Sequence, residues 1–141
     1  MSSPPGAPLL LLIDDDSGDR AIVERAVDAS YRVHGVASLE AALTLLRVST
    51  PEVVVVDLSL GPASDDWAGT LAALSEITHA PLVVYTGHTH ATTQPLRGLL
   101  LRAGADGVVA KEAPILALTA ALSDARDRLH RDRLQTRVRL A

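Results

Sequence analysis

The sequence predicts an α/β fold in which a five-stranded parallel sheet has helices on both faces. Short apolar segments alternate five times with longer segments of helical periodicity along the 141 residues. The third apolar segment, Val53–Val56, is four β-branched residues in a row, which is typical of a strand buried on both faces. Aspartates directly follow the first and third apolar segments, at the edge of the sheet where open α/β folds place their sites.

Two strands and a helix are expected at the start of the chain. Leu9–Ile13 is a continuous apolar run and is predicted to be the first strand. Asp16 or Ser17 can cap the helix that follows, which has an apolar face up to about Ala29. Residues 31–36 are short and alternate between apolar and polar, so they are predicted to form a strand nearer the edge of the sheet.

The second helix is predicted to begin after Ser38, and Pro51 lies beyond its end. Val53–Val56 then forms the third strand. The loop of residues 59–66 is long for such a connection, which usually has about 2–6 residues. A helix over about residues 67–77 is expected after it.

The last two strands are predicted at residues 81–86 and at Gly107–Ala110. A polar loop and a helix over about residues 95–103 separate them, and Gly104 ends this helix. The final helix begins near Pro114, because proline is tolerated in the first turn of a helix.

Composition excludes several functional classes. The chain has no cysteine, which excludes disulfides, thiol catalysis and zinc sites of the Cys type. A net charge of −4 gives no general signature of nucleic-acid binding, and no apolar run approaches the length of a membrane span. Residues 1–8 lack the features of a secretory signal, so we predict a disordered lead-in and a cytoplasmic location.

The domain organisation is predicted as one compact domain over residues 9–123 and a C-terminal helical extension over residues 124–141. Residues 124–139 hold six Arg and three Asp and therefore carry a net charge of +3. Their apolar positions do not follow a strict heptad, which favours a solvated helix. A dimerisation helix and a linker to a further domain are the alternative interpretations.

Two acidic segments are expected to meet at the end of the sheet. Asp14, Asp15 and Asp16 follow the first strand, and Asp57 follows the third. Like charges at close range raise one another's pKa unless a cation lies between them. Mg²⁺ prefers oxygen ligands in near-octahedral geometry, so we expect Asp15, Asp57 and a backbone carbonyl just past Asp57 to bind it. One oxygen of Asp57 is then free to attack phosphorus.

A lysine and a threonine follow two other strands. Lys111 is the one lysine among 13 basic residues, and a compact ammonium on a flexible stem suits a point contact with phosphate. The hydroxyl of Thr86 can hydrogen-bond another phosphoryl oxygen. Taken singly, an acidic strand end fits a solvated helix cap equally well, but these groups together indicate a phosphoryl site.

These residues resemble the receiver domain of two-component response regulators, the CheY-like family, which has the flavodoxin-like strand order 2-1-3-4-5. The resemblance runs from about Leu9 to Ser123. The segments that carry it are 11–20 (LLIDDDSGDR), 53–59 (VVVVDLS), 83–87 (VVYTG) and 104–111 (GADGVVAK).

The resemblance implies a role for each site residue. Asp57 is the phosphoacceptor, Asp14 and Asp15 are the acidic pair with Asp15 a direct Mg²⁺ ligand, and Ser59 lends its carbonyl to the metal. Thr86 is the switch hydroxyl and Lys111 the phosphate-binding lysine. Side chains at the positions of Ser59 and His88 tune how long the phosphate survives.

The resemblance also implies partners. A sensor histidine kinase or a phosphotransfer protein supplies the phosphoryl group, and an output protein binds the face of the fourth helix, fifth strand and fifth helix. A homodimer through that face or through the C-terminal helix is a hypothesis. We expect no enzyme activity beyond self-phosphorylation and autodephosphorylation at Asp57, and no direct contact with nucleic acid or membrane.

Three departures from the family concern the switch. Val108 stands where the family usually has Tyr or Phe, and valine is short and stiff at χ1, so the output signal must differ or run through the loops. Glu112 stands where the family usually has Pro, which removes the usual cis-peptide option because a non-proline cis bond costs about 2.5–4 kcal/mol. The segment 61–69 is longer than the tight loop of the family.

Other interpretations fit parts of the sequence. Asp14 and Asp16 match the Asp-x-Asp pattern of haloacid-dehalogenase-type phosphatases, but no acidic pair follows Lys111 to complete that metal site. A degenerate receiver that only binds other proteins is a second alternative. His88 and His90 have no evident third ligand and are interpreted as surface residues rather than a transition-metal site.

Overall fold

The computed structural model describes residues 6–58, 67–87 and 96–140, with side chains up to residue 135. Five strands alternate with five helices in the described part of the chain, as the sequence predicts. The elements are β1 (Leu9–Ile13), α1 (Ser17–Val27), β2 (Arg32–Val36), α2 (Leu39–Leu46), β3 (Val53–Val56), α3 (Trp67–Ile77), β4 (Leu82–Thr86), α4 (Leu96–Arg102), β5 (Gly107–Ala110) and α5 (Ile115–Leu140).

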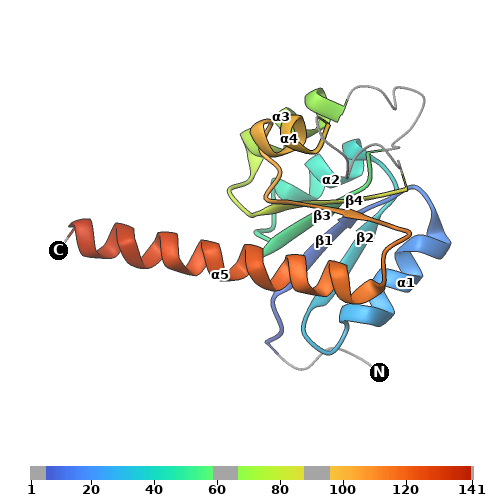
Figure 1. The fold of residues 1–141 in the computed structure, drawn as a ribbon, viewed down its shortest axis with the longest axis horizontal. Coiled ribbons are helices and arrows are strands. Elements are labelled where there is room, and N and C mark those ends of the chain that lie inside the picture. The colour runs from blue at the N-terminus through green and yellow to red at the C-terminus, as the bar shows by residue number, and fades with distance from the viewer. Residues whose placement is uncertain (1–5, 59–66, 88–95, 141) are drawn as a thin grey trace.

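All five strands are parallel and lie in the order β2-β1-β3-β4-β5. The expected order 2-1-3-4-5 is therefore confirmed, and β2 is an edge strand, as its short alternating sequence predicts. Helices α1 and α5 cover one face of the sheet, and α2, α3 and α4 cover the other (Figure 1). This is the arrangement that right-handed crossover connections produce in a doubly wound sheet.

Alternation along the strands divides the core into two halves. Leu10, Leu12 and Val55 face α1 and α5, whereas Leu11 and Val54 face the other three helices. All four residues of β3 are at most 1% exposed, because helices cover both faces of this central strand. The run of four valines is thus explained by its place in the middle of the sheet.

The helix starts follow the predicted caps. Asp16 is the N-cap of α1, and its side chain accepts a hydrogen bond from the backbone N–H of Asp19 at 2.9 Å. Ser38 caps α2 in the same way. The helix α1 ends at Val27, two residues before the expected end. Gly104 follows α4 with a φ of +119°, a backbone conformation that side chains with a Cβ rarely adopt.

The last helix is longer than its contact with the sheet. α5 runs for 26 residues, and its C-terminal half projects past the sheet (Figure 1). Leu118, Leu122 and Ala125 are buried against the sheet. α5 continues without a break through residues 123 and 124. The domain boundary predicted between these two residues stays a prediction. No helix in the described part of the chain is long and apolar enough to span a membrane.

Candidate functional site

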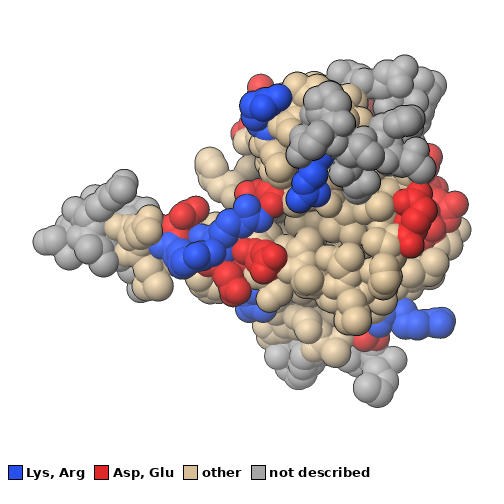
Figure 2. Space-filling view, in the orientation of Figure 1, with Lys and Arg blue, Asp and Glu red and all other residues tan. Residues whose placement is uncertain are grey.

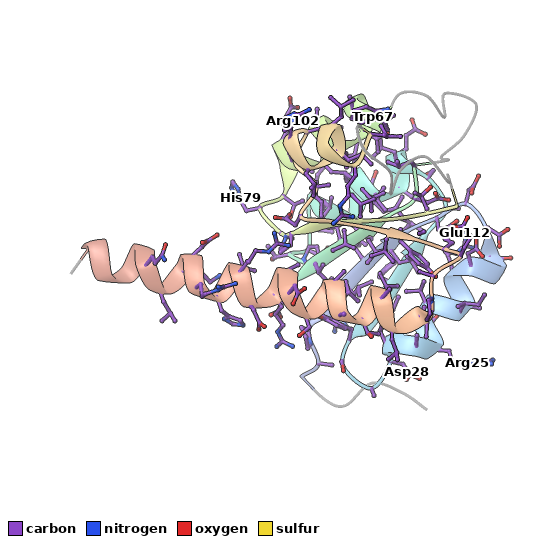
Figure 3. All side chains as sticks on the ribbon, in the orientation of Figure 1. Arg25, Asp28, Trp67, His79, Arg102 and Glu112 are labelled. Carbon is purple, nitrogen blue, oxygen red and sulfur yellow. The ribbon has the colours of Figure 1, made fainter. Side chains whose placement is uncertain are left out.

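Three strand ends bring the predicted acidic and basic residues together. Asp14 follows β1, Asp57 follows the neighbouring β3, and Lys111 follows β5. The backbone N–H of Asp57 donates to the carbonyl of Ile13 at 2.9 Å, which fixes Asp57 beside Asp14. Acidic side chains gather on the side of the molecule where α1 begins (Figure 2). Glu112, directly after Lys111, lies at the same edge (Figure 3).

Three carboxylates lie close enough to share one cation. One carboxylate oxygen each from Asp14, Asp15 and Asp57 lie within 4.8 Å of one another. Asp14 is 1% exposed and Asp57 is 4% exposed, whereas Asp15 is open to solvent. Hard divalent cations take such oxygen ligands. Asp14, Asp15 and Asp57 could therefore hold a metal ion, as the sequence predicts.

Burial sets the protonation behaviour of Asp14. Removal from water raises the pKa of this carboxyl above its ordinary value, since it disfavours the charged form. The hydrogen bond from Lys111 lowers the pKa, and so does the backbone N–H of Asp16, which donates to Asp14 Oδ1 at 3.0 Å. These two donors therefore offset part of the effect of burial on the Asp14 carboxyl.

Lys111 is the cation of the site, and three carboxylates surround it. Its Nζ lies 2.7 Å from Asp14 Oδ2, 2.7 Å from Asp19 Oδ2 and 3.2 Å from Asp57 Oδ2. Burial alone would lower the pKa of this lysine, but the hydrogen bonds to Asp14 and Asp19 and the charge of Asp57 raise it above the ordinary value. Lys111 is therefore charged throughout the neutral range.

The role of Asp19 in this cluster of charges was not predicted from the sequence. Asp19 lies in the first turn of α1, directly after the loop that carries the predicted acidic pair. That position was the available signal, because the first turn of this helix faces the site. The ring of Tyr85 was also missed, with its centroid 6.0 Å from the ammonium of Lys111.

A second missed feature fixes the backbone of Asp14. The guanidinium of Arg20 donates from Nη1 to the carbonyl of Asp14 at 2.6 Å. The Arg20 side chain packs against Gly35 of β2. A Cβ atom added at Gly35 would lie 3.1 Å from Arg20 Cδ. Gly35 thus leaves the space in which this arginine holds the acidic loop.

Thr86 and Val108 lie on the face of the sheet that α2, α3 and α4 cover, opposite to the face covered by α1. Thr86 ends β4, is fully buried and pairs in register with Ala110, the residue before Lys111. Val108 packs in the half of the core under α2, α3 and α4, and its carbonyl accepts a hydrogen bond from Arg97 at 2.9 Å. Ser59 and His88 lie outside the described residues, so their predicted roles remain predictions.

The sequence that forms these strand ends matches a known protein family. The model of the response regulator receiver domain matches residues 10–123. The chain belongs to this family. The match covers most of the chain, so the chain is a receiver domain and not a haloacid-dehalogenase-type phosphatase. No curated protein matches the chain.

Solved receiver domains have the same fold. A CheY-like receiver domain from Methanospirillum hungatei has a TM-score of 0.77 at 16% identity, over 90% of this chain and 99% of that chain. The receiver domain of the Francisella response regulator 1452 has a TM-score of 0.74 at 18% identity, over 86% and 98%. A response regulator from Burkholderia pseudomallei, with a phosphorylated aspartic acid, calcium ion and citrate, has a TM-score of 0.70 at 26% identity, over 91% and 74%.

Proposed function

We propose that this receiver domain accepts a phosphoryl group on Asp57, with Mg²⁺, from a phosphohistidine on a sensor histidine kinase or phosphotransfer protein. The observation that carries the proposal is the convergence of Asp14, Asp15 and Asp57 on one point, with Lys111 Nζ 3.2 Å from Asp57 Oδ2. A carboxylate that could act as a nucleophile, two further carboxylates and a cation thus lie in one small volume. The Burkholderia relative carries a phosphorylated aspartic acid and a calcium ion, which supports the assignment.

The transfer follows from the chemistry of these side chains. A carboxylate oxygen of Asp57 forms a bond to phosphorus while the bond between phosphorus and the histidine nitrogen breaks, and that nitrogen keeps the electron pair. Lys111 neutralises a phosphoryl oxygen during this displacement, and the Thr86 hydroxyl donates to another. Lys111 is charged and its Nζ lies 3.2 Å from Asp57 Oδ2, so the cation is already beside the reacting carboxylate.

The cluster Asp14, Asp15 and Asp57 fits Mg²⁺, which keeps several water ligands and needs only a few from the protein. Ser59 would add its carbonyl. When bound, the ion would draw negative charge from the carboxylates and from the phosphoryl oxygens. Asp14 is buried, so the cluster of carboxylates exists only in the folded state. An ion that binds this cluster would therefore stabilise the folded state.

Mg²⁺ is expected to raise the free energy of unfolding by about 1.4 kcal/mol when its free concentration is tenfold above the Kd. Asp15→Asn should lose most of this gain, because the exposed Asp15 belongs to the ligand cluster but not to the core. Urea unfolding with MgCl₂, against NaCl of equal ionic strength, measures the difference. Asp16→Asn is the matched control, since asparagine caps a helix as well as aspartate. Equal stabilisation of the wild type and Asp15→Asn would contradict the assignment.

The proposed output is a change in protein contacts. Phosphorylation draws Thr86 and Lys111 toward the phosphoryl group and alters the α4–β5–α5 face, where an output protein or a second copy of the chain binds. Val108 cannot copy the movement of a large aromatic side chain. The signal at this face therefore depends on Thr86 and the loops. The expected compartment is the cytoplasm.

Intact-mass spectrometry after incubation with acetyl phosphate and Mg²⁺ tests the proposed function. We expect one added phosphoryl group on the wild type and none on Asp57→Asn, because the amide is not a nucleophile for phosphorus. Asp28→Asn, which removes a carboxylate at the far end of α1, should be modified as the wild type is. If the wild type gains no phosphoryl group from acetyl phosphate or from a phosphorylated kinase, the degenerate receiver is the correct interpretation.

A further inference from the structure

All three donors of the Lys111 ammonium are directed at carboxylates. The contacts with Asp14 and Asp19 are the short ones at 2.7 Å, and the contact with the proposed phosphoacceptor Asp57 is the longest at 3.2 Å. A lysine ammonium has three protons and no more. The contact with Asp57 can pass to a phosphoryl oxygen, but a phosphoryl group extends beyond the carboxylate that carries it. The ammonium must therefore move to reach it, and one of the two short contacts is then given up or lengthened. This inference rests on the proposed function.

Asp19 holds its place by the backbone of α1. Its N–H donates to the N-cap side chain of Asp16 at 2.9 Å, so the first turn of the helix carries the carboxylate to Lys111. Within the described part of the chain, the one ion pair that Asp19 forms is with Lys111. The contact thus links the site to α1 directly.

The exposure of the two carboxylates determines which short contact is released more easily. The side chain of Asp14 is 1% exposed, and an uncompensated charge there would be costly because water cannot replace the lysine. The side chain of Asp19 is 35% exposed, so water can solvate its carboxylate when the lysine leaves.

We propose that Asp19 is a positioning residue that holds Lys111 on the α1 side of the site, and that the Lys111–Asp19 ion pair is the contact given up when Asp57 is phosphorylated. Two consequences follow. Asp19 opposes an anion on Asp57, because it competes for the ammonium and adds a negative charge nearby. Phosphorylation also frees the first turn of α1 from the strand end of β5, on the face of the sheet opposite to Val108.

The single lysine of the chain allows a direct test. Labelling with lysine that carries ¹⁵N at Nζ gives one side-chain ammonium signal, which belongs to Lys111. In the metal-free protein, Asp19→Asn is expected to shift this signal and to speed its exchange with water. Asparagine can still accept a hydrogen bond, so this variant removes mainly the charge, and Asp19→Ala removes both.

Beryllofluoride with Mg²⁺ mimics the phosphoryl group and completes the test. In the wild type, the Lys111 signal should move on binding, and in the bound state it should coincide with that of bound Asp19→Asn. Asp19→Asn is expected to bind beryllofluoride about three- to tenfold more tightly than the wild type, since one partly screened charge is removed. Glu24→Gln, which neutralises an exposed carboxylate of α1 that does not contact Lys111, should change neither signal nor affinity.

Each outcome distinguishes this proposal from the proposed function. An ammonium signal of Asp19→Asn identical to the wild-type signal would overturn the positioning role, and so would equal or weaker binding of beryllofluoride by this variant. A wild type that does not bind beryllofluoride would overturn the proposed function and the exchange of contacts with it. Asp57→Asn is the negative control for binding, because it should not bind the mimic under any of these conditions.

Discussion

Replacing Lys111 with methionine is expected to lower the free energy of unfolding by about 3 kcal/mol in metal-free buffer at neutral pH. Methionine has a similar length and no charge, so the substitution removes the cation with little change in volume. It leaves the carboxylates of Asp14 and Asp57 buried without their cation. Removal of one partner from a buried ion pair is strongly destabilising because the remaining charge is not solvated.

The pH dependence of this loss has a definite sign. The pKa of Asp14 already lies above its ordinary value of 3.8, and removal of Lys111 raises it further. A carboxyl whose pKa is raised by folding destabilises the fold as the pH rises through that raised value. The deficit of Lys111→Met should therefore be largest at neutral pH and should shrink as the pH falls toward 3.8.

Urea unfolding at about pH 7 and about pH 5 measures this trend. Mg²⁺ should restore part of the lost stability at neutral pH, because it supplies positive charge to the same carboxylates. Arg47→Met, which removes an exposed cation at the end of α2, is the matched control and should change stability by less than about 0.5 kcal/mol. A deficit of Lys111→Met that is the same at both pH values would contradict the buried-charge argument.

The sequence predicts the acidic half of this site well, for a physical reason. Asp14 and Asp57 directly follow apolar strands, and parallel strands end at one edge, so periodicity alone brings the two carboxylates together. The approach of Asp19 and Arg20 depends instead on how α1 is oriented over the sheet. That orientation follows from packing, including the space left by Gly35 on the neighbouring strand, and no local pattern encodes it.

The fold was predictable for a similar reason. Each strand is a short apolar run, and capping residues such as Asp16 and Ser38 mark where helices begin. Exact helix ends were less accurate, as α1 shows, because several residues can end a helix at similar cost. The order of the strands came from the resemblance to a family and not from the pattern of the residues.

Ending the chain after Ser123 is expected to cost about 2–3 kcal/mol of unfolding free energy, even though sequence composition places a boundary there. The contacts of α5 with the body continue past this position. Ala125 is 1% exposed, and Arg126 Nε lies 3.0 Å from Glu52 Oε1. Arg128 also donates to the carbonyl of Asp106, in the turn before β5. Each contact is modest, but the truncation removes all of them and frays the buried turn before them.

Ending the chain after Arg131 is the matched comparison, and it should change stability by less than about 0.5 kcal/mol. This shorter truncation keeps Ala125, Arg126 and Arg128, and residues 132–135 beyond it are exposed. Leu134, for example, is 60% exposed. Thermal and urea unfolding of the two truncated chains against the full chain measures the difference.

If the chain ending at Ser123 is as stable as the full chain, the composition-based boundary is correct and the Arg126 and Arg128 contacts contribute nothing. If the loss is as expected, the structural domain extends into α5 as far as Arg128. Any role of the extension in binding a partner then belongs to the residues that follow it, where charge rather than burial determines the sequence.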